Sequence, residues 1–322
     1  MKNYILPYFF LLVFLVLNIN SDENNSMDYK EEMRMFVERI SGHSRSINPG
    51  FYIIPQNGQE LLTLDGEENG IHVLKYIKAI DGVGREDLFY GYSRDNRATP
   101  KKEIAYMLSF LNIAKKYNLT VLVTDYCRDH VKMEDSYSKN NNHGYISFSA
   151  NERNLNNIPD FPGVPHNVNS SDITSLANAK NFLYIINPER FSSKSDFLNA
   201  LSNTNYDIIL IDLFFNEEEL SRSDINSLKV KKNGGKRLIL GYMSIGEAED
   251  YRYYWKKEWG HRKPAWMAKE NPEWEGNYKV KYWHSEWQKI ILRNGDSYLN
   301  RIISAGFDGV YLDIIDAFEY FE

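Results

Sequence analysis

Several apolar runs of this chain end in a carboxylate, and this pattern constrains the fold more than any other feature. The clearest run, Val310 to Ile315, is interrupted by Asp313 and followed by Asp316. Three other runs end at Asp125, Asp212 and Glu247. An ionised carboxylate in a buried strand is costly unless it is paired or emerges at an open end. Strands that end in carboxylates are typical of a (β/α) barrel, whose chemistry lies at the carboxyl ends of parallel strands.

The spacing of the apolar runs predicts the whole barrel. Eight segments with strand character lie near residues 52, 79, 121, 147, 184, 209, 240 and 311, with helices between most of them. Met33 to Ile40 forms an amphipathic stripe, and Pro100 opens a helix through Lys116. The polar, Asn-rich stretch from Arg128 to His143 is expected to be a loop. We therefore predict an α/β protein with a (β/α)8 TIM barrel. An open doubly wound sheet is the alternative, but no Gly-rich phosphate loop follows a predicted strand.

Composition and the N-terminal segment limit the classes of partner that the protein can have. The 322 residues carry a formal net charge of -6, which argues against a nucleic-acid partner. Residues 1–22 have one early lysine, an apolar run and a polar flank, as a secretory signal peptide does, and an uncleaved N-terminal anchor is the alternative. We expect a secreted or cell-envelope protein that touches a membrane only through that segment.

Metal and disulfide chemistry have little support in the sequence. Cys127 is the only cysteine, which excludes an internal disulfide framework and a cysteine-based metal site. The seven histidines are scattered, without a His-x-His or His-x-x-x-His pair. We therefore predict no metal site and no cofactor.

Four motifs resemble one family of enzymes. They begin at Ile54-Pro55-Gln56-Asn57-Gly58, Tyr242-Met-Ser-Ile-Gly246-Glu247, Asn271-Pro-Glu-Trp-Glu-Gly and Gly306-Phe-Asp-Gly-Val-Tyr-Leu-Asp313. In these residues the chain is similar to the polygalactosaminidase-like glycoside hydrolases, family 114 and its bacterial and archaeal relatives. The resemblance runs from about residue 28 to residue 322. It implies that residues 28–322 form one glycoside-hydrolase-like (β/α)8 barrel.

The order of the motifs departs from that family. There, the strand resembling Phe182 to Ile186 comes first, and the Ile54 motif follows the strand that ends at Asp313. We therefore interpret the chain as circularly permuted, with a piece of a longer or tandem protein as the alternative. In a permuted barrel, the strand after Phe51 lies parallel beside the strand that ends at Asp313.

The resemblance also implies the reacting groups. Glycoside hydrolysis needs two carboxyl groups, one as proton donor and the other as nucleophile or as base for water. By resemblance, Asp313 is the nucleophile or base and Glu86 is the proton donor. A helix cap or ion pair is the structural alternative for Asp313, and a solvated charge cluster is the alternative for Glu86.

A second set of residues is expected to bind the sugar. Asp212 and Glu247 are expected to bind hydroxyl or amino groups, and Arg252 to orient a carboxylate, although structural ion pairs would fit equally well. The remaining substrate-binding candidates are Asp250, Gln56, Asn57, Asp125, Asp316 and Tyr311. Tyr311 fits either the core or a sugar face.

The predicted function is hydrolysis of an α-linked amino-sugar polysaccharide, as in an endo-α-1,4-polygalactosaminidase. Carboxylates at the mouth of the barrel suit a partly deacetylated, cationic polymer. A non-catalytic carbohydrate-binding barrel, or a fragment of a tandem or split hydrolase, are the alternatives.

Overall fold

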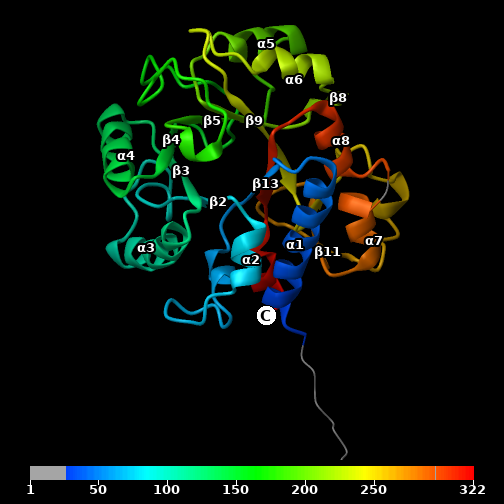
Figure 1. Cartoon of the computed structure of the whole chain (residues 1–322). Helices are drawn as coiled ribbons and strands as arrows, with labels where there is room; N and C mark the ends of the chain where they lie inside the picture. The colour runs from blue at the N-terminus through cyan, green and yellow to red at the C-terminus, as the bar shows by residue number, and fades with distance from the viewer. Residues whose placement is uncertain (1–26, 294) are drawn as a thin grey trace, which may run out of the picture.

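The computed structural model describes residues 27–293 and 295–322, so the predicted signal peptide or anchor at residues 1–22 lies outside it. Within the described residues, parallel strands alternate with helices (Figure 1). The parallel strands are β1 (Tyr52–Pro55), β2 (Gly82–Glu86), β3 (Thr120–Tyr126), β4 (Ile146–Ala150), β5 (Phe182–Tyr184), β6 (Ile208–Ile211), β9 (Leu238–Ser244) and β13 (Gly309–Asp313). The helices are α1 (Tyr29–Ile47), α2 (Leu74–Ala79), α3 (Lys101–Lys116), α4 (His130–His143), α5 (Lys194–Ser202), α6 (Arg222–Leu228), α7 (Ser285–Gln288) and α8 (Tyr298–Ala305).

Short antiparallel strands extend the loops that follow two of the parallel strands. After β6 comes a hairpin of β7 (Phe214–Phe215) and β8 (Glu218–Glu219). After β9 comes a small sheet of β10 (Glu247–Glu249), β12 (Asn277–Val280) and β11 (Met267–Glu270), in that order. The 3-10 helices are η1 (Gln59–Leu62), η2 (Leu176–Asn178), η3 (Lys257–Gly260) and η5 (Ile315–Tyr320), and η4 (Lys289–Arg293) is a π-helix.

Strand β1 pairs in parallel with β13, although the two lie near opposite ends of the chain. Tyr52 faces Gly309 and Pro55 faces Leu312. The predicted pairing of the strand after Phe51 with the strand that ends at Asp313 is therefore confirmed. The strand order β1-β13-β9-β6-β5 places this N-terminal strand in the sheet of the C-terminal half.

The remaining parallel strands form a second sheet in the order β2-β3-β4, and residues of the two sheets are in contact at two places. On one side, Gln56 bridges to Gly84, and the backbone N–H of Asn57 donates to the Gly84 carbonyl at 2.9 Å. On the other side, the rings of Phe148 on β4 and Phe182 on β5 lie 5.8 Å apart. The two sheets are thus adjacent along β1/β2 and along β4/β5.

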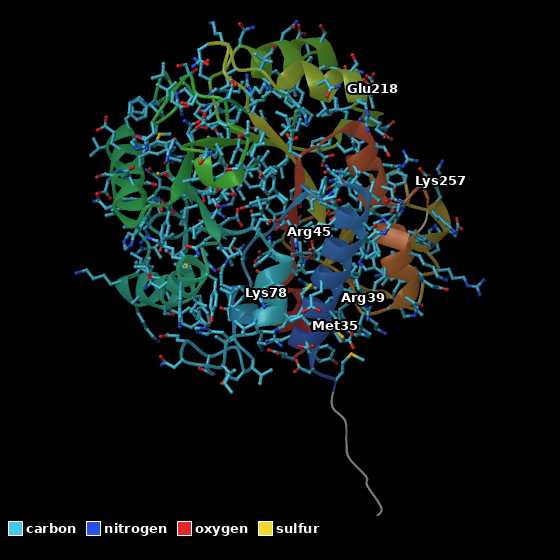
Figure 2. All side chains as sticks on the ribbon, viewed as in Figure 1. Met35, Arg39, Arg45, Lys78, Glu218 and Lys257 are labelled. Atoms are coloured by element: carbon cyan, nitrogen blue, oxygen red, sulfur yellow. The ribbon has the colours of Figure 1, made fainter. Side chains whose placement is uncertain are left out.

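Helix α1 has one strongly apolar face, and that face is buried. Asp28 caps the first turn by accepting a hydrogen bond from the N–H of Glu31 at 2.9 Å. Met33, Phe36, Val37 and Ile40 are fully buried. Met35, Arg39 and Arg45 follow the outward face in Figure 2, and Arg45 reaches Asp81 at 2.8 Å. Helix α1 thereby packs against α2, α8 and η5.

The loop predicted from Arg128 to His143 is wrong, because this stretch contains α4. Asp129 caps the first turn and Gly144 ends the helix in the left-handed conformation. Its buried face is partly polar: the Ser136 hydroxyl and the Asn140 amide donate to Asp125 Oδ2 at 2.7 and 3.2 Å. A helix that buries serine and asparagine lacks the apolar period from which helices are predicted.

The strand predicted near residue 79 lies instead at β2, and residue 79 ends α2. Strand β2 has only one large apolar residue, Val83, because glycines fill the positions next to it. A Cβ on Gly84 would lie 1.9 Å from the Tyr311 hydroxyl, and one on Gly82 would lie 2.6 Å from the Thr120 carbonyl. Glycine is therefore required at both positions, because a tyrosine and a neighbouring strand approach the backbone closely. The glycines also remove the run of apolar residues from which a strand is usually predicted.

Candidate active site

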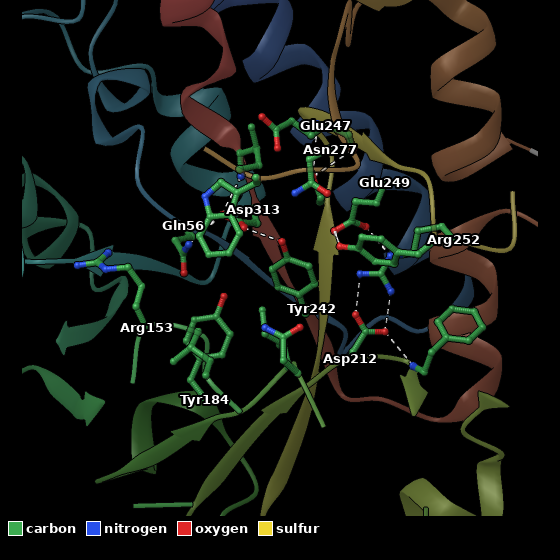
Figure 3. Close-up of a pocket in the computed structure, with 18 of the residues that line it drawn as sticks. Gln56, Arg153, Tyr184, Asp212, Tyr242, Glu247, Glu249, Arg252, Asn277 and Asp313 are labelled. Atoms are coloured by element: carbon green, nitrogen blue, oxygen red, sulfur yellow. Dashed lines mark hydrogen bonds and ion pairs between the residues drawn. The ribbon is translucent and has the colours of Figure 1, made fainter. Parts of the chain in front are cut away.

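A cavity of about 570 Å³ lies where the parallel strands end. Glu86 ends β2, Asp313 ends β13 and Gln56 follows β1, so three strands deliver polar side chains to one place. Figure 3 shows Gln56 and Asp313 beside each other there. The C-terminal ends of parallel strands are where α/β proteins place their chemistry. The cavity is therefore the candidate active site.

The side chain of Gln56 joins the two carboxylates. Its Nε2 donates to Glu86 Oε2 at 3.0 Å and to Asp313 Oδ1 at 2.8 Å. The separation of the two oxygen atoms therefore cannot exceed the sum of these distances. Glycosidases that retain configuration hold their carboxyl groups about 5–5.5 Å apart, and inverting ones about 6.5–9.5 Å apart. For these two oxygen atoms, the upper bound is smaller than the separations found in inverting enzymes.

Each carboxylate is oriented by further donors. The Tyr242 hydroxyl donates to Asp313 Oδ2 at 2.7 Å, and the N–H of Ile314 donates to Oδ1 at 2.9 Å. Glu86 accepts hydrogen bonds from the Asn57 amide at 3.1 Å and from the Tyr126 hydroxyl. These donors hold both side chains in place, and the hydrogen bonds from Tyr242 and Ile314 act to lower the pKa of Asp313.

Burial works against ionisation of Asp313. Burial, and next the negative charge of Glu86, raise the pKa of Asp313 to about 7. Two carboxylates this close do not both ionise easily, so the pair shares one proton over a range of pH. Such a pair can supply one acid and one base or nucleophile.

Asp212 and Arg252 bind each other on the far side of the cavity from Gln56 (Figure 3). Arg252 Nη1 donates to Asp212 Oδ1 at 2.8 Å, and Nη2 lies 2.7 Å from Oδ2. Arg252 Nε also donates to Glu249. Burial alone would lower the pKa of Arg252, but Asp212 and Glu249 raise it well above its usual value. All three residues line the cavity, and the ion pairs hold its wall together.

Glu247 lines the cavity from β10. Its Oε1 accepts from the Asn271 amide at 2.9 Å and lies 3.5 Å from Lys279 Nζ. Burial raises the pKa of Glu247. Gly246, which precedes it, does not line the cavity, and a Cβ there would lie 2.2 Å from the Ile314 carbonyl. The small residue serves packing against η5.

The cavity brings together most of the predicted site residues but not all of them. Lining it are Asp313, Glu86, Gln56, Asn57, Asp212, Glu247, Arg252 and Asp316. Tyr311 is fully buried in the core beside Tyr184, and Asp125 is buried by α4 and the N–H groups of Phe89 and Tyr90. Asp250 is exposed next to Gly276. These last three do not line the cavity.

Sequence reasoning missed several residues that support the site. Tyr126 and Tyr242 donate to the carboxylate pair, and Arg153 lies over the Tyr126 ring at 3.9 Å. Glu249 accepts a hydrogen bond from Arg252 Nε. A signal for Glu249 was available: it stands two residues after Glu247 in an extended segment, so both side chains point to one face. A tyrosine inside an apolar strand carries no comparable signal, because it equally fits the core.

Residues 27–293 and 295–322 offer neither a metal-binding cluster nor a membrane-spanning helix. Within that part of the chain, no cluster of three or more His, Cys, Asp or Glu side chains suited to a metal ion was found. Over the same residues, no helix combines the length and apolar character needed to cross a bilayer.

Comparison with known proteins agrees with the character of the site. The model of glycoside-hydrolase family GH114 matches residues 166–322, so that part of the chain is similar to the family. The resemblance seen in the sequence is thereby confirmed. The match does not extend to residues 28–165, which supply Gln56, Asn57 and Glu86.

Three curated relatives are each described as an uncharacterized protein. One from Methanocaldococcus jannaschii is 41% identical over 152 residues, which is 47% of this chain and 42% of the relative. Another, from Thermotoga maritima, is 42% identical over 120 residues, covering 37% of this chain and 36% of the relative. The chain thus spans about two fifths of the length of the curated relatives it matches.

Proposed function

We propose that this chain is a glycoside hydrolase that cleaves an α-linked amino-sugar polysaccharide, in the manner of an endo-α-1,4-polygalactosaminidase. The observation that carries this proposal is the pair Glu86 and Asp313, joined by the Gln56 amide at 3.0 and 2.8 Å. The family match of residues 166–322 supports the reaction class. Substrate and linkage rest on the resemblance to that family.

The charge of the cavity supports a cationic substrate. Its carboxylates are Glu86, Glu189, Asp212, Glu217, Glu247, Glu249, Asp313 and Asp316. Arg153 and Arg252 also line it, but each is held by acidic neighbours: Arg153 by Asp87 and Asp95, and Arg252 by Asp212 and Glu249. A protonated amine on a deacetylated sugar would offset the remaining negative charge.

In the proposed reaction, the one proton that the pair shares passes from Glu86 to the oxygen of the leaving sugar as the glycosidic bond breaks, while Asp313 is ionised. Asp313 attacks the anomeric carbon, and Glu86 then takes a proton from the water that releases the covalent sugar. The short separation of the pair favours this retaining course over one in which Asp313 activates water directly. Gln56 Oε1, buried and without a partner among the described residues, would accept a hydrogen bond from the substrate.

We propose further that residues 28–322 form one closed, circularly permuted (β/α)8 barrel. The pairing of β1 with β13, the bridge from Gln56 to Gly84, and the Phe148–Phe182 contact support it. In this arrangement Glu86 and Asp313 reach one cavity from opposite halves of the chain.

The function is tested by incubating the purified chain with a panel of amino-sugar polysaccharides and measuring new reducing ends. We expect release from deacetylated α-1,4-linked polygalactosamine and slower release from its acetylated form. The two other candidates give different results. A non-catalytic carbohydrate-binding barrel would bind a polymer without releasing ends, and an incomplete fragment would fail to fold alone.

The activity should fall as pH rises through about 7, because the pKa of Asp313 is raised to about 7 by burial and by Glu86. The reactive state of the pair holds one proton, and above this pH that proton leaves. The measurement is kcat/KM against pH, corrected for titration of the substrate amines. Glu86→Gln removes the neighbouring charge, so the pKa of Asp313 should fall in that variant. A flat profile between neutral and strongly alkaline pH would contradict the shared proton.

Replacing Glu247 with Gln should weaken binding more than turnover. The substitution removes one negative charge but keeps the oxygen that accepts from Asn271. Loss of a charge-assisted hydrogen bond to an amine corresponds to about a tenfold rise in KM, with kcat changed only a few-fold. Separate measurement of kcat and KM checks this. An unchanged KM with abolished turnover would assign Glu247 to proton transfer instead.

We also propose that the protein is exported, because residues 1–22 have the pattern of a signal peptide. N-terminal sequencing of the native protein should begin near the end of that segment, or the intact chain should be found in a membrane fraction. Intact chain free in the cytoplasm would overturn export.

A further inference from the structure

Trp274 differs from the other tryptophans in its surroundings. Trp255 packs with Trp259 and Tyr278, Trp266 packs with Trp287, and Trp283 packs with Tyr29. Among the described residues, no ring contact is found for Trp274, and its side chain is 46% exposed. It lines the cavity that holds the carboxylate pair. A large apolar surface is therefore presented to whatever fills the cavity.

The hairpin between β11 and β12 holds Trp274 firmly although its ring is unpacked. The N–H of Trp274 donates to the Asn271 carbonyl at 3.3 Å, and its own carbonyl accepts from the N–H of Asn277 at 3.1 Å. The N–H of Gly276 donates to Glu270 Oε1 at 2.9 Å, and its carbonyl accepts from the N–H of Asp250. A rigid backbone lowers the entropy lost when a ligand stacks on the ring.

Two polar groups stand with this ring on the cavity wall. The Asn271 amide ties the hairpin to Glu247 Oε1 at 2.9 Å, so the ring and the carboxylate belong to one unit. Asn277, labelled beside Glu247 in Figure 3, has a buried Oδ1 without a partner among the described residues. An unpaired buried acceptor costs free energy unless a ligand donates to it.

We propose that Trp274, Glu247 and Asn277 form a sugar-binding subsite apart from the carboxylate pair. The indole stacks on the apolar face of one sugar ring, Glu247 binds its ammonium or hydroxyl group, and Asn277 Oδ1 accepts from a second polar substituent. This subsite rests on the proposed function, since it holds the substrate of the same cavity. It makes Trp274 a determinant of binding rather than of bond cleavage.

Binding is measured in an Asp313→Asn background, which is expected to keep the ligand intact. The probe is the hexasaccharide of α-1,4-linked galactosamine, followed by calorimetry and by tryptophan fluorescence. Trp274→Ala should weaken binding on the order of tenfold to a hundredfold, because the variant loses an aromatic surface that the bound sugar would cover. It should also abolish most of the fluorescence change. Trp274→Phe should recover part of the affinity.

The control is Tyr92→Ala, because Tyr92 is similarly exposed, at 48%, and does not line the cavity. It should leave affinity unchanged. If the Asp313→Asn chain binds the hexasaccharide and Trp274→Ala binds it equally well, the subsite is refuted and the proposed function stands. If the Asp313→Asn chain binds neither this probe nor other amino-sugar oligomers, both proposals fail.

Discussion

Replacing Asp313 with Asn, or Glu86 with Gln, is expected to lower kcat by about a thousandfold or more while the chain still binds substrate. Glu86→Gln removes the group that transfers the proton, and Asp313→Asn removes the group that attacks the sugar. Neither removes bulk from the cavity. The measurement is kcat from reducing-end release, with Kd from calorimetry on the same preparations.

The stability of these variants separates loss of chemistry from loss of fold. Burial and Glu86 raise the pKa of Asp313 to about 7, so its ionised form is disfavoured in the folded state. Removing that charge should leave Tm at neutral pH unchanged or raised. Asp160→Asn and Glu134→Gln are matched controls on exposed residues outside the cavity and should keep full activity. Near-normal kcat in either active-site variant would remove that residue from the pair.

Replacing Arg252 with Met is expected to destabilise the fold by about 3–5 kcal/mol. The guanidinium is buried, makes two contacts with Asp212 at 2.8 and 2.7 Å, and also donates to Glu249. Its removal leaves two buried carboxylates without a counter-charge. Chemical denaturation, with the midpoint and slope both recorded, measures the loss.

Two companion variants show whether the ion pairs are the cause. Arg252→Lys keeps the charge but loses the two-point contact, so an intermediate loss is expected. Adding Asp212→Asn to Arg252→Met removes one stranded charge and should restore part of the stability. Burial already raises the pKa of Asp212, so the defect of Arg252→Met should shrink as pH falls and the carboxylate is protonated. A loss below about 1 kcal/mol, as for an exposed pair, would contradict a structural role.

The strands that end in carboxylates could be predicted from sequence because burial and charge conflict there. Asp313 and Asp212 interrupt apolar runs, and that conflict is visible without a structure. Elements whose buried faces are polar or made of glycine could not be found this way. Helix α4 buries Ser136 and Asn140 against Asp125, and β2 needs Gly84 to admit Tyr311.

The geometry of the site was harder to predict than its composition. The sequence places Gln56 among the remaining substrate-binding candidates, yet in the structure it donates to Asp313, 257 positions away, and to Glu86 at the same time. Asp212 and Arg252 were equally compatible with sugar binding and with an ion pair, and the structure pairs them with each other. Local sequence cannot decide such questions, because the partner comes from another strand.

The most direct test of the central claim compares the unmodified chain with the double variant Asp313→Asn/Glu86→Gln on deacetylated α-1,4-linked polygalactosamine. Reducing ends are counted over time at equal protein concentration. If Glu86 and Asp313 carry the reaction, the unmodified chain should release reducing ends steadily and the double variant should release none above background. Equal release by the two, or none by a folded unmodified chain that binds the polymer, would contradict it.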